Sequence, residues 1–571
     1  MHIMKYLLSG ILLLGWLVPL HFLPWVSWHS EVVVFFSAFL AAWAGLGRCY
    51  RIDQSCMIGV PILTLSLVLL AFLAFGQSVV GLISFKGDAL IIALYTILCV
   101  VCVVMGFAST RQVTTFFVKS LGGRNEPQAL TCLAATLTIG AFASAILAFA
   151  QVFELWEHAS WINRMQYLRR PGGNLGQPNQ LATLLLMGMV GILFLYESRR
   201  LNGLPSILIF LTLCVALAAS ESRTGVLSFL LLSVWWFAKN RQADFRLSPW
   251  LVVLATICFL SLFWTWPSLF SFLQQSSGAG AVVDTKPGYR LVVWPQLLEA
   301  LMQRPWWGWG LGEVSEAHNA VAHAYAVSEP YSYSHNLLLD LALGMGMPLT
   351  ALLVVATCVW LWRRVQTANR LLPWYCLALA LPVAVHSMLE FPFAYAYFLV
   401  PVMFALGALE GMTEEKPVLQ IGARPVAALL LGVSILGGWS VVEYLRIEED
   451  FRVARFEALR LGQTPTDYQK PKIVLLTQLD ALLGGARIVP KPSMMLDELA
   501  LAKKVALRYP WTATQNRYAL SLALNGHPEE AVRQLRVMKA MHGEKTYQEI
   551  KANWKSLAQD KYPQLRELAL P

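Results

Sequence analysis

A histidine at the start of an apolar run is the best candidate for proton transfer in this chain. His335 and Asn336 follow the letters "YSYS" and precede "LLLDLALGMG". A neutral imidazole can accept a proton near neutral pH, which few other side chains do. His335 could instead only cap the helix that begins there. Its position beside several arginines and a helix end favours acid–base chemistry.

Arginines stand near this histidine on what the loop charges predict to be the same side of a membrane. They are Arg169, Arg170, Arg223 and Arg290. Guanidinium groups bind phosphate through paired hydrogen bonds and would stabilise the charge on a departing diphosphate. A base that deprotonates a hydroxyl, combined with such arginines, predicts group transfer from a lipid diphosphate. Each arginine alone could also be a solubilising or interfacial residue.

The stretch 169–182, "RRPGGNLGQPNQLA", is rich in amides and glycines. Its Gly-Gln-Pro-Asn turn is predicted to open a helix, with Pro178 near the start, where a missing N–H does no harm. Gln177 and Asn179 can both donate and accept hydrogen bonds. A helix N-terminus beside two arginines attracts anions. An ordinary capped turn would use the same residues, so both interpretations stay open.

The stretch 386–398, "HSMLEFPFAYAYF", holds the last cluster. His386 and Glu390 are four residues apart, a spacing that predicts one shared helix face. Pro392 is expected to break that helix near the membrane surface, and Tyr395 follows the break. A polar contact between helices is the alternative use of His386 and Glu390.

Nothing in these clusters requires a metal ion or a cofactor. No Asp-x-Asp pair stands on the predicted outer side, and His318 and His323 are interpreted as solvated loop residues. The nine cysteines lie in predicted helices or at their inner edges, and this placement predicts no structural disulfide.

The elements that carry these residues are predicted to be membrane helices. Hydrophobic types make up 57% of the 571 residues and charged types 14%, against about 25% charged in soluble proteins. Runs long enough to span a bilayer predict an all-α polytopic fold with about thirteen transmembrane helices, at 4–23, 31–47, 57–75, 89–108, 129–154, 180–196, 204–219, 223–238, 249–270, 335–362, 373–390, 394–410 and 425–444.

Loop charges predict the orientation of the chain. Most basic residues lie in short loops that are on the inner side if the N-terminus is inside, so the net charge of +10 reflects membrane topology and not nucleic-acid binding. The apolar N-terminus is read as the first span and not as a removed signal. Residues 1–444 then form a membrane domain with one long outside loop, 271–334. Residues 445–571 form an outside helical domain, in which 519–543 resembles one tetratricopeptide-like hairpin.

Several of these stretches, in this order, resemble the O-antigen ligase and polymerase superfamily. They are "GNLGQPNQLA", "SRTG", "PWWGWGLG", "SHNLLLDLALGMG" and "HSMLEFPFAYAYF". The Gly-Gln-Pro-Asn stretch is most similar to the pilin-type protein O-oligosaccharyltransferases of Gram-negative bacteria. The resemblance implies an inner-membrane glycosyltransferase that works without metal in the periplasm. It would move a glycan en bloc from undecaprenyl diphosphate to Ser or Thr of an exported protein such as pilin.

The resemblance also implies roles for single residues. His335 takes the place of the catalytic histidine, Gln177 and Tyr395 match motif positions, and Arg223 and Arg290 match diphosphate-binding positions. The chain departs from many relatives at Gln180, where they carry histidine.

Three other functions stay open at this stage. An O-antigen ligase would use the same chemistry with lipid A–core as the acceptor, and a polymerase would extend glycans. A transporter also fits the composition and the broken helices, although no internal repeat is visible and the charges gather at one face.

Overall fold

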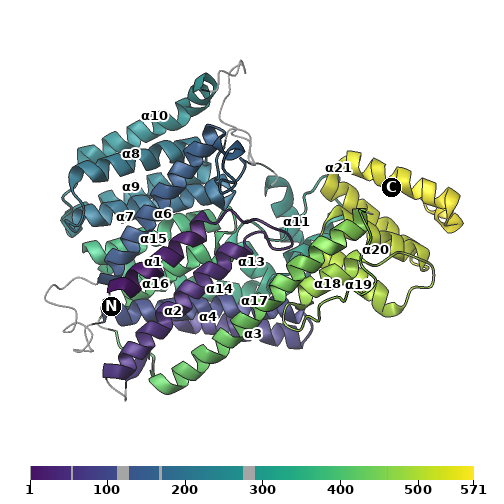
Figure 1. Ribbon diagram of the computed structural model, residues 1–571, viewed down its shortest axis with the longest axis horizontal. Helices are drawn as coiled ribbons and strands as arrows, with labels where there is room; N and C mark the ends of the chain where they lie inside the picture. Colours follow the sequence, from purple (N-terminus) through teal and green to yellow (C-terminus); the bar gives the residue numbers. More distant parts are fainter. Residues whose placement is uncertain are drawn as a thin grey trace. The chain divides into compact units, whose positions relative to one another are not determined.

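The computed structural model describes residues 2–52, 56–111, 128–165, 170–273, 288, 290–413, 415–459 and 461–571. Arg169, one of the predicted phosphate-binding arginines, lies outside the described residues. The described residues are mostly helical (Figure 1), and their one sheet has two strands. The predicted all-α class is therefore confirmed.

The chain forms helices in every region where the sequence predicts a span. In the first half they are α1 (His2–Leu17), α2 (Trp28–Ile52), α3 (Leu63–Val79), α4 (Lys86–Thr110), α6 (Gln128–Val152), α7 (Pro178–Glu197), α8 (Gly203–Ala219), α9 (Arg223–Ala243) and α10 (Pro249–Leu273). In the second half they are α13 (Leu337–Met345), α14 (Met347–Thr367), α15 (Leu371–Ser387), α16 (Ala396–Gly411) and α17 (Ala423–Leu459). The predicted outside loop contains two more helices, α11 (Arg290–Gln303) and α12 (Val314–Ala322).

Two predicted spans are interrupted in the structure. The segment 57–75 begins with strand β1 (Met57–Val60), which pairs antiparallel with β2 (Leu419–Gly422). The segment 335–362 is divided into α13 and α14 at Gly346, whose φ of +81° leaves the helical region. Hydrophobicity alone predicted one continuous helix in each place because it does not report backbone conformation.

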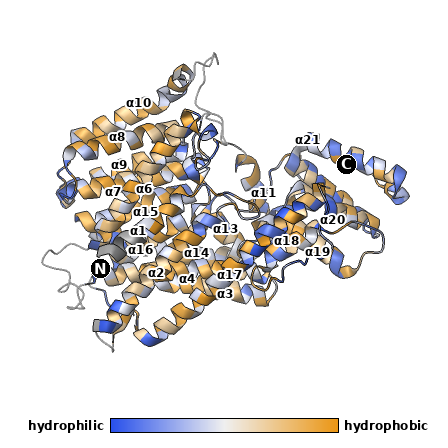
Figure 2. Cartoon of the chain, in the orientation of Figure 1, coloured by the Kyte–Doolittle hydropathy of each residue, from blue (hydrophilic) through white to orange (hydrophobic). Residues whose placement is uncertain are grey.

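Seven of the described helices are long and apolar enough to cross a membrane. They are Trp28–Arg51, Lys86–Thr110, Gln128–Val152, Pro178–Glu197, Pro249–Phe272, Met347–Thr367 and Ala423–Leu459. Figure 2 shows hydrophobic residues along most of α7 and α8, as expected for helices that avoid water on all sides. A multi-pass membrane protein is thus supported, while the number thirteen stays a prediction.

The described chain divides into two compact units. The first unit comprises 1–69, 95–285 and 356–435, and the second comprises 70–94, 286–355 and 436–571. The predicted division at residue 444 concerns the membrane boundary and stays a prediction.

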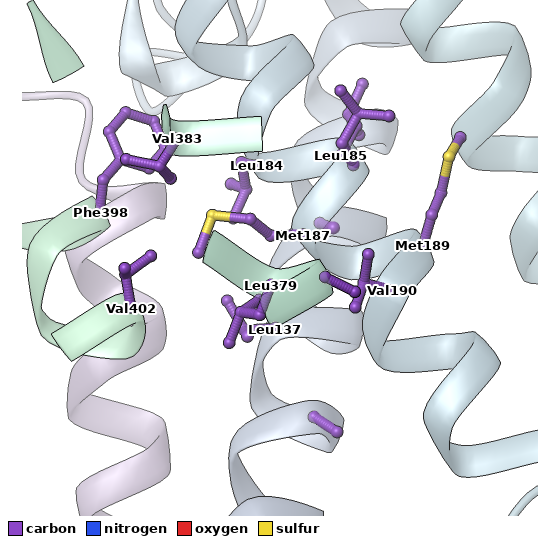
Figure 3. Close-up of a cluster of buried hydrophobic side chains, with 14 of the residues drawn as sticks. Leu137, Leu184, Leu185, Met187, Met189, Val190, Leu379, Val383, Phe398 and Val402 are labelled. Carbon is purple, nitrogen blue, oxygen red and sulfur yellow. The ribbon is translucent and has the colours of Figure 1, made fainter. Parts of the chain in front are cut away.

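The core of the first unit is formed by α6, α7, α15 and α16, with α7 packed against both α6 and α15. Figure 3 shows Met187 and Val190 of α7 among Leu137, Leu379 and Phe398, all fully or nearly fully buried. Tight burial of this kind fixes the axial position of α7, and therefore the position of the polar turn at its N-terminus.

The second unit contains the loop helices α11 and α12 and the C-terminal helices α18 (Thr477–Ala486), α19 (Leu496–Arg508), α20 (Thr512–Leu524) and α21 (Pro528–Asp560). The predicted hairpin within 519–543 is confirmed, because α20 and α21 pack together after a turn at Gly526 with φ +81°. Helix α12 packs against both α19 and α21.

The expectation of no disulfide is wrong for one pair. Cys49, in α2, and Cys56, just before β1, are joined by a disulfide. The chain returns after α2 to pair β1 with β2, which brings the two Cα atoms to 6.0 Å, a usual separation for a disulfide.

Replacement of Gly346 by alanine should destabilise the fold. Its φ of +81° belongs to glycine, and an added Cβ would collide with the main chain of Trp306. We expect Gly346→Ala to cost about 1–3 kcal/mol, seen as a lower melting temperature in detergent. The control Gly432→Ala lies in α17 with nothing within 4 Å of its added Cβ, and it should leave the melting temperature unchanged or raise it. Equal effects of the two changes would contradict the argument.

Candidate functional site

The buried carboxylate of Glu390 joins two motifs of the first unit. Its side chain is 6% exposed. Gln177 Nε2 donates to Glu390 Oε2 at 3.4 Å, and Asn179 Nδ2 donates to Oε1 at 3.2 Å. Gln177 is the residue before α7, and Pro178 is the first residue of that helix, as the sequence predicted. The amides of the Gly-Gln-Pro-Asn turn therefore contact the "HSMLE" stretch directly.

The expected shared helix face of His386 and Glu390 is wrong. Helix α15 ends at Ser387, and Glu390 lies beyond that end, where its N–H donates to His386 O at 2.8 Å. Its carboxylate is turned toward the start of α7. His386 is buried, and its Nδ1 lies 2.8 Å from Thr183 Oγ1. Both side chains make polar contacts with the start of α7, so the prediction of polar contact between helices is confirmed.

Asn179 also reaches the start of α9. Ser222 Oγ donates to Asn179 Oδ1 at 2.8 Å and accepts from Gly225 N at 3.0 Å, which makes Ser222 the cap of α9. Arg223 is the first residue of α9, as predicted, and is exposed. One asparagine thus ties the capped helix end that carries Arg223 to the carboxylate of Glu390.

Arg170 lies against the same turn between α8 and α9. Its Nε donates to the carbonyl oxygen of Ser220, the residue that follows α8, at 3.0 Å. Since Arg223 follows Ser220 by three residues, the structure brings these two arginines to one turn of the chain.

Tyr395 is the residue that precedes α16, and the carboxylate of Glu31, which the sequence did not predict, accepts a hydrogen bond from the first residue of this helix. The ring of Tyr395 stacks with those of Phe391 and Tyr397 at centroid distances of 5.9 and 5.1 Å. The next residue, Ala396, donates its N–H to Glu31 Oε2 at 2.7 Å, and Tyr95 donates its hydroxyl to the same oxygen at 2.9 Å.

Glu31 is 2% exposed, and it lies outside the sequence motifs that predicted the other site residues. The available signal was a single carboxylate at the start of an apolar run, a placement that is costly unless it is used.

Gln180, the position that departs from many relatives, has a defined partner. It is buried, and its Oε1 accepts from the hydroxyl of Tyr397 at 2.9 Å. Trp16 Nε1 donates to the carbonyl oxygen of Tyr397 at 3.1 Å. Gln180 therefore helps to fix α16 beside α7.

In the second unit, His335 and Asn336 have different structural roles. Asn336 is the cap of α13, since its Oδ1 accepts from Leu339 N at 3.1 Å. The interpretation of His335 as the helix cap is therefore wrong. His335 has φ +59°, unusual for a residue other than glycine, and its half-buried ring lies 4.5 Å from that of Tyr331.

The residue before His335 is held from both sides. The N–H and the hydroxyl of Ser334 both donate to Asp340 Oδ2, the former at 2.9 Å. Trp294 Nε1 donates to Ser334 O at 2.7 Å. Trp294 lies one turn after Arg290, the first residue of α11. Asp340 was missed because a carboxylate one turn into a helix gives no sign of its partner.

His318 is buried in α12, so its interpretation as a solvated residue is wrong. Its Nε2 lies 2.9 Å from both Gln296 Oε1 and Ser328 Oγ. Burial lowers the pKa of His318 to about 4. Nearby, burial raises the pKa of Glu313 to about 7, although Glu313 Oε1 accepts from Ser84 N at 2.8 Å. The long loop thus has a packed polar core of its own.

The predicted site residues fall into two described groups. Gln177, Asn179, His386, Glu390, Tyr395, Arg170 and Arg223 lie in the first unit, and Arg290, His335 and Asn336 lie in the second. Within the part of the chain that the structure describes, no group of three or more His, Cys, Asp or Glu is placed to hold a metal ion.

Three regions of the chain match known families. Residues 171–196 match the protein glycosylation ligase family, 207–354 match the O-antigen ligase family, and 374–557 match the C-terminal part of the virulence factor membrane-bound polymerases.

Two curated relatives come from Acinetobacter baylyi. A general O-oligosaccharyltransferase is 25% identical over 95% of this chain and 93% of its own length. A ComP-specific O-oligosaccharyltransferase is 28% identical over 64% of this chain and 65% of its own length. These matches confirm the resemblance seen in the motifs. They make the chain an enzyme of the glycosyltransferase class and leave the transporter hypothesis without support.

The buried imidazole of His318 should make the fold sensitive to acid. In the unfolded chain this group takes up a proton near pH 6.5, but in the fold only near pH 4. Between these values the unfolded state binds more protons, so stability is lost as the pH falls, by up to about 3 kcal/mol. We expect the melting temperature in detergent to fall less between pH 7 and pH 4.5 in His318→Gln than in the wild type.

The comparison isolates His318, because Glu313 acts with the opposite sign and is present in both proteins. Its raised pKa lowers stability as the pH rises from 4.5 toward 7. Parallel curves for wild type and His318→Gln would show that His318 does not stay neutral in the fold.

Proposed function

We propose that this protein is a protein O-oligosaccharyltransferase. It takes a glycan from undecaprenyl diphosphate and transfers it en bloc to Ser or Thr hydroxyls of periplasmic proteins such as pilin. The observation that carries the proposal is the contact of Gln177 and Asn179 with Glu390. That contact gives a defined geometry to the motif that is most specific for protein glycosylation, within the region that matches the protein glycosylation ligases.

In the proposed reaction His335 is the general base. The acceptor oxygen attacks C1 of the first sugar while His335 takes the hydroxyl proton. The bond between C1 and the diphosphate oxygen breaks, and the electron pair leaves with the diphosphate. His335 has an unusual positive φ, and Ser334 beside it is hydrogen-bonded to Asp340. Both features support the proposal that the imidazole ring must be placed precisely.

The arginines are proposed to bind the diphosphate. Arg223 is exposed at a helix start, and Arg170 is fixed at the same turn. Arg290 begins α11, and Arg169 is assigned to this role from sequence alone. Guanidinium groups would offset the charge that grows on the leaving group, and the N-terminus of α9 would add a favourable dipole.

The remaining residues are proposed to orient the donor and the motifs. Gln177 and Tyr395 would contact the substrate. Glu390 would hold Gln177 by hydrogen bonding, His386 would support the start of α7, and Asn336 would support the start of α13. The whole would face the periplasm, in an inner-membrane protein whose N-terminus is cytoplasmic.

An O-antigen ligase is the second candidate. The match of 207–354 to the O-antigen ligase family favours it, since this region contains Arg223, Arg290 and His335. The reaction would be the same, with lipid A–core in place of a protein hydroxyl.

Glycan transfer by purified protein tests both candidates. Wild type, His335→Ala and the control His158→Ala, which changes an exposed histidine, receive undecaprenyl-diphosphate glycan with either pilin or lipid A–core. We expect glycosylated pilin from wild type and His158→Ala and none from His335→Ala, because only His335 is the proposed base.

Transfer to lipid A–core alone would replace the acceptor and keep the mechanism. Full activity of His335→Ala would remove His335 from the mechanism. No transfer to either acceptor, with a donor that other enzymes accept, would refute the proposed function.

Asn179 offers a test of the site geometry. Asn179→Ala removes both the donor to Glu390 and the acceptor for Ser222. We expect kcat/KM for glycan transfer to fall by about tenfold to a hundredfold, because small misplacements of reacting groups have effects of this size. The control Asn369→Ala breaks a contact with Lys239. Lys239 is near the end of α9 and Asn369 just precedes α15, so this contact lies at the opposite ends of these helices from the motifs. The control should stay within about twofold of wild type.

A further inference from the structure

Helix α11 carries an exposed apolar stripe. Leu291, Leu298 and Met302 are 63%, 51% and 64% exposed, and exposed Pro295 lies between the first two. The spacing of four, three and four residues places all of them on one helix face.

The opposite face of α11 is apolar as well. Val293, Leu297 and Ala300 are fully buried in the core of the loop. A helix needs only one apolar face to pack on the rest of the protein. The exposed stripe is a second apolar face, so it needs a separate apolar environment. Contiguous exposed apolar surface of this kind marks a binding surface.

The segment after α11 exposes two tryptophans. Trp306 and Trp307 are 70% and 80% exposed. The neighbouring Trp309 is buried instead, with Nε1 donating to Ala300 O at 2.8 Å and its ring 4.0 Å from the guanidinium carbon of Arg304. The turn is thus fixed through Trp309, and Trp306 and Trp307 remain available to a partner.

This turn is attached to the start of α14, and residues close to it are attached to α3. Met347 N, at the start of α14, donates to Pro305 O at 2.8 Å. Gln77, near the end of α3, donates to Gly344 O at 2.8 Å and accepts from Leu311 N at 2.9 Å. Helix α14 is a candidate membrane span, so the turn lies at the level where that span would enter the bilayer.

We propose that α11 and the turn 305–309 lie on the bilayer surface, with the stripe Leu291, Pro295, Leu298 and Met302 immersed in lipid. Trp306 and Trp307 anchor this face at the membrane–water interface, the level at which tryptophan gathers in membrane proteins. This inference concerns where the loop sits and does not rest on the proposed glycan transfer.

The length and ends of α11 favour this position over two others. Its 14 residues span about 21 Å as a helix, too short to cross a hydrocarbon core of about 30 Å. Arg290 and Arg304 at its two ends suit anionic headgroups and would not suit a fully apolar protein interface.

Fluorescence quenching by lipids tests the inference on the full-length chain in phospholipid nanodiscs. Leu298→Cys and the control Gln303→Cys are each labelled with bimane in a background of Cys132→Ser, Cys258→Ser and Cys358→Ser. Gln303 is exposed on the same helix but lies off the stripe. Phospholipid with a nitroxide on its acyl chain should remove most of the emission at Leu298→Cys and little at Gln303→Cys.

Two results would overturn the inference. Weak acyl-chain quenching at both positions would place the stripe in water or under protein. Quenching at Leu298→Cys that disappears on addition of polyprenyl diphosphate would assign the stripe to the carrier chain. A second labelled position, Met302→Cys, guards against misfolding of a single variant and should behave like Leu298→Cys.

Discussion

The hydrogen bonds to the buried carboxylate of Glu390 are the contact on which the polar part of the first unit depends. A carboxylate at this depth is costly unless donors surround it. The amides of Gln177 and Asn179 supply these donors, and Asn179 in turn holds the cap of α9. The starts of α7 and α9 and the segment after α15 are thereby joined through one acid. The tightly packed core below them leaves α7 little freedom to shift.

In the second unit, buried polar side chains are likewise held by hydrogen bonds from neighbouring elements. Ser334 donates to the carboxylate of Asp340, and Gln296 and Ser328 lie within hydrogen-bond distance of His318 Nε2. The C-terminal helices take part in this arrangement. Asn319 of α12 and Gln534 of α21 exchange amide hydrogen bonds at 3.4 and 3.1 Å. The C-terminal helices thus brace α12, in the loop that precedes His335.

A buried polar group in a membrane-spanning region must find its partners within the protein. Within hydrocarbon, backbone groups are satisfied only by helices, and polar side chains only by one another. Breaks in helices, such as Gly346 between α13 and α14, therefore occur where other main chain or polar groups cover them. The exposed stripe of α11 is the complementary case, in which apolar side chains turn outward and, in our proposal, contact lipid.

The sequence by itself determined the helical membrane class, the start of α7 at Pro178, and the start of α9 at Arg223. These features depend on local hydrophobicity and on helix caps that act within four residues, so the amino-acid sequence is sufficient to predict them. Only the tertiary structure decided that Glu390 contacts Asn179, 211 residues away in sequence, that Glu31 holds Ala396, and that His318 is buried. Such pairings follow from the packing of whole helices. The identity of one side chain does not determine which distant residue this packing places beside it.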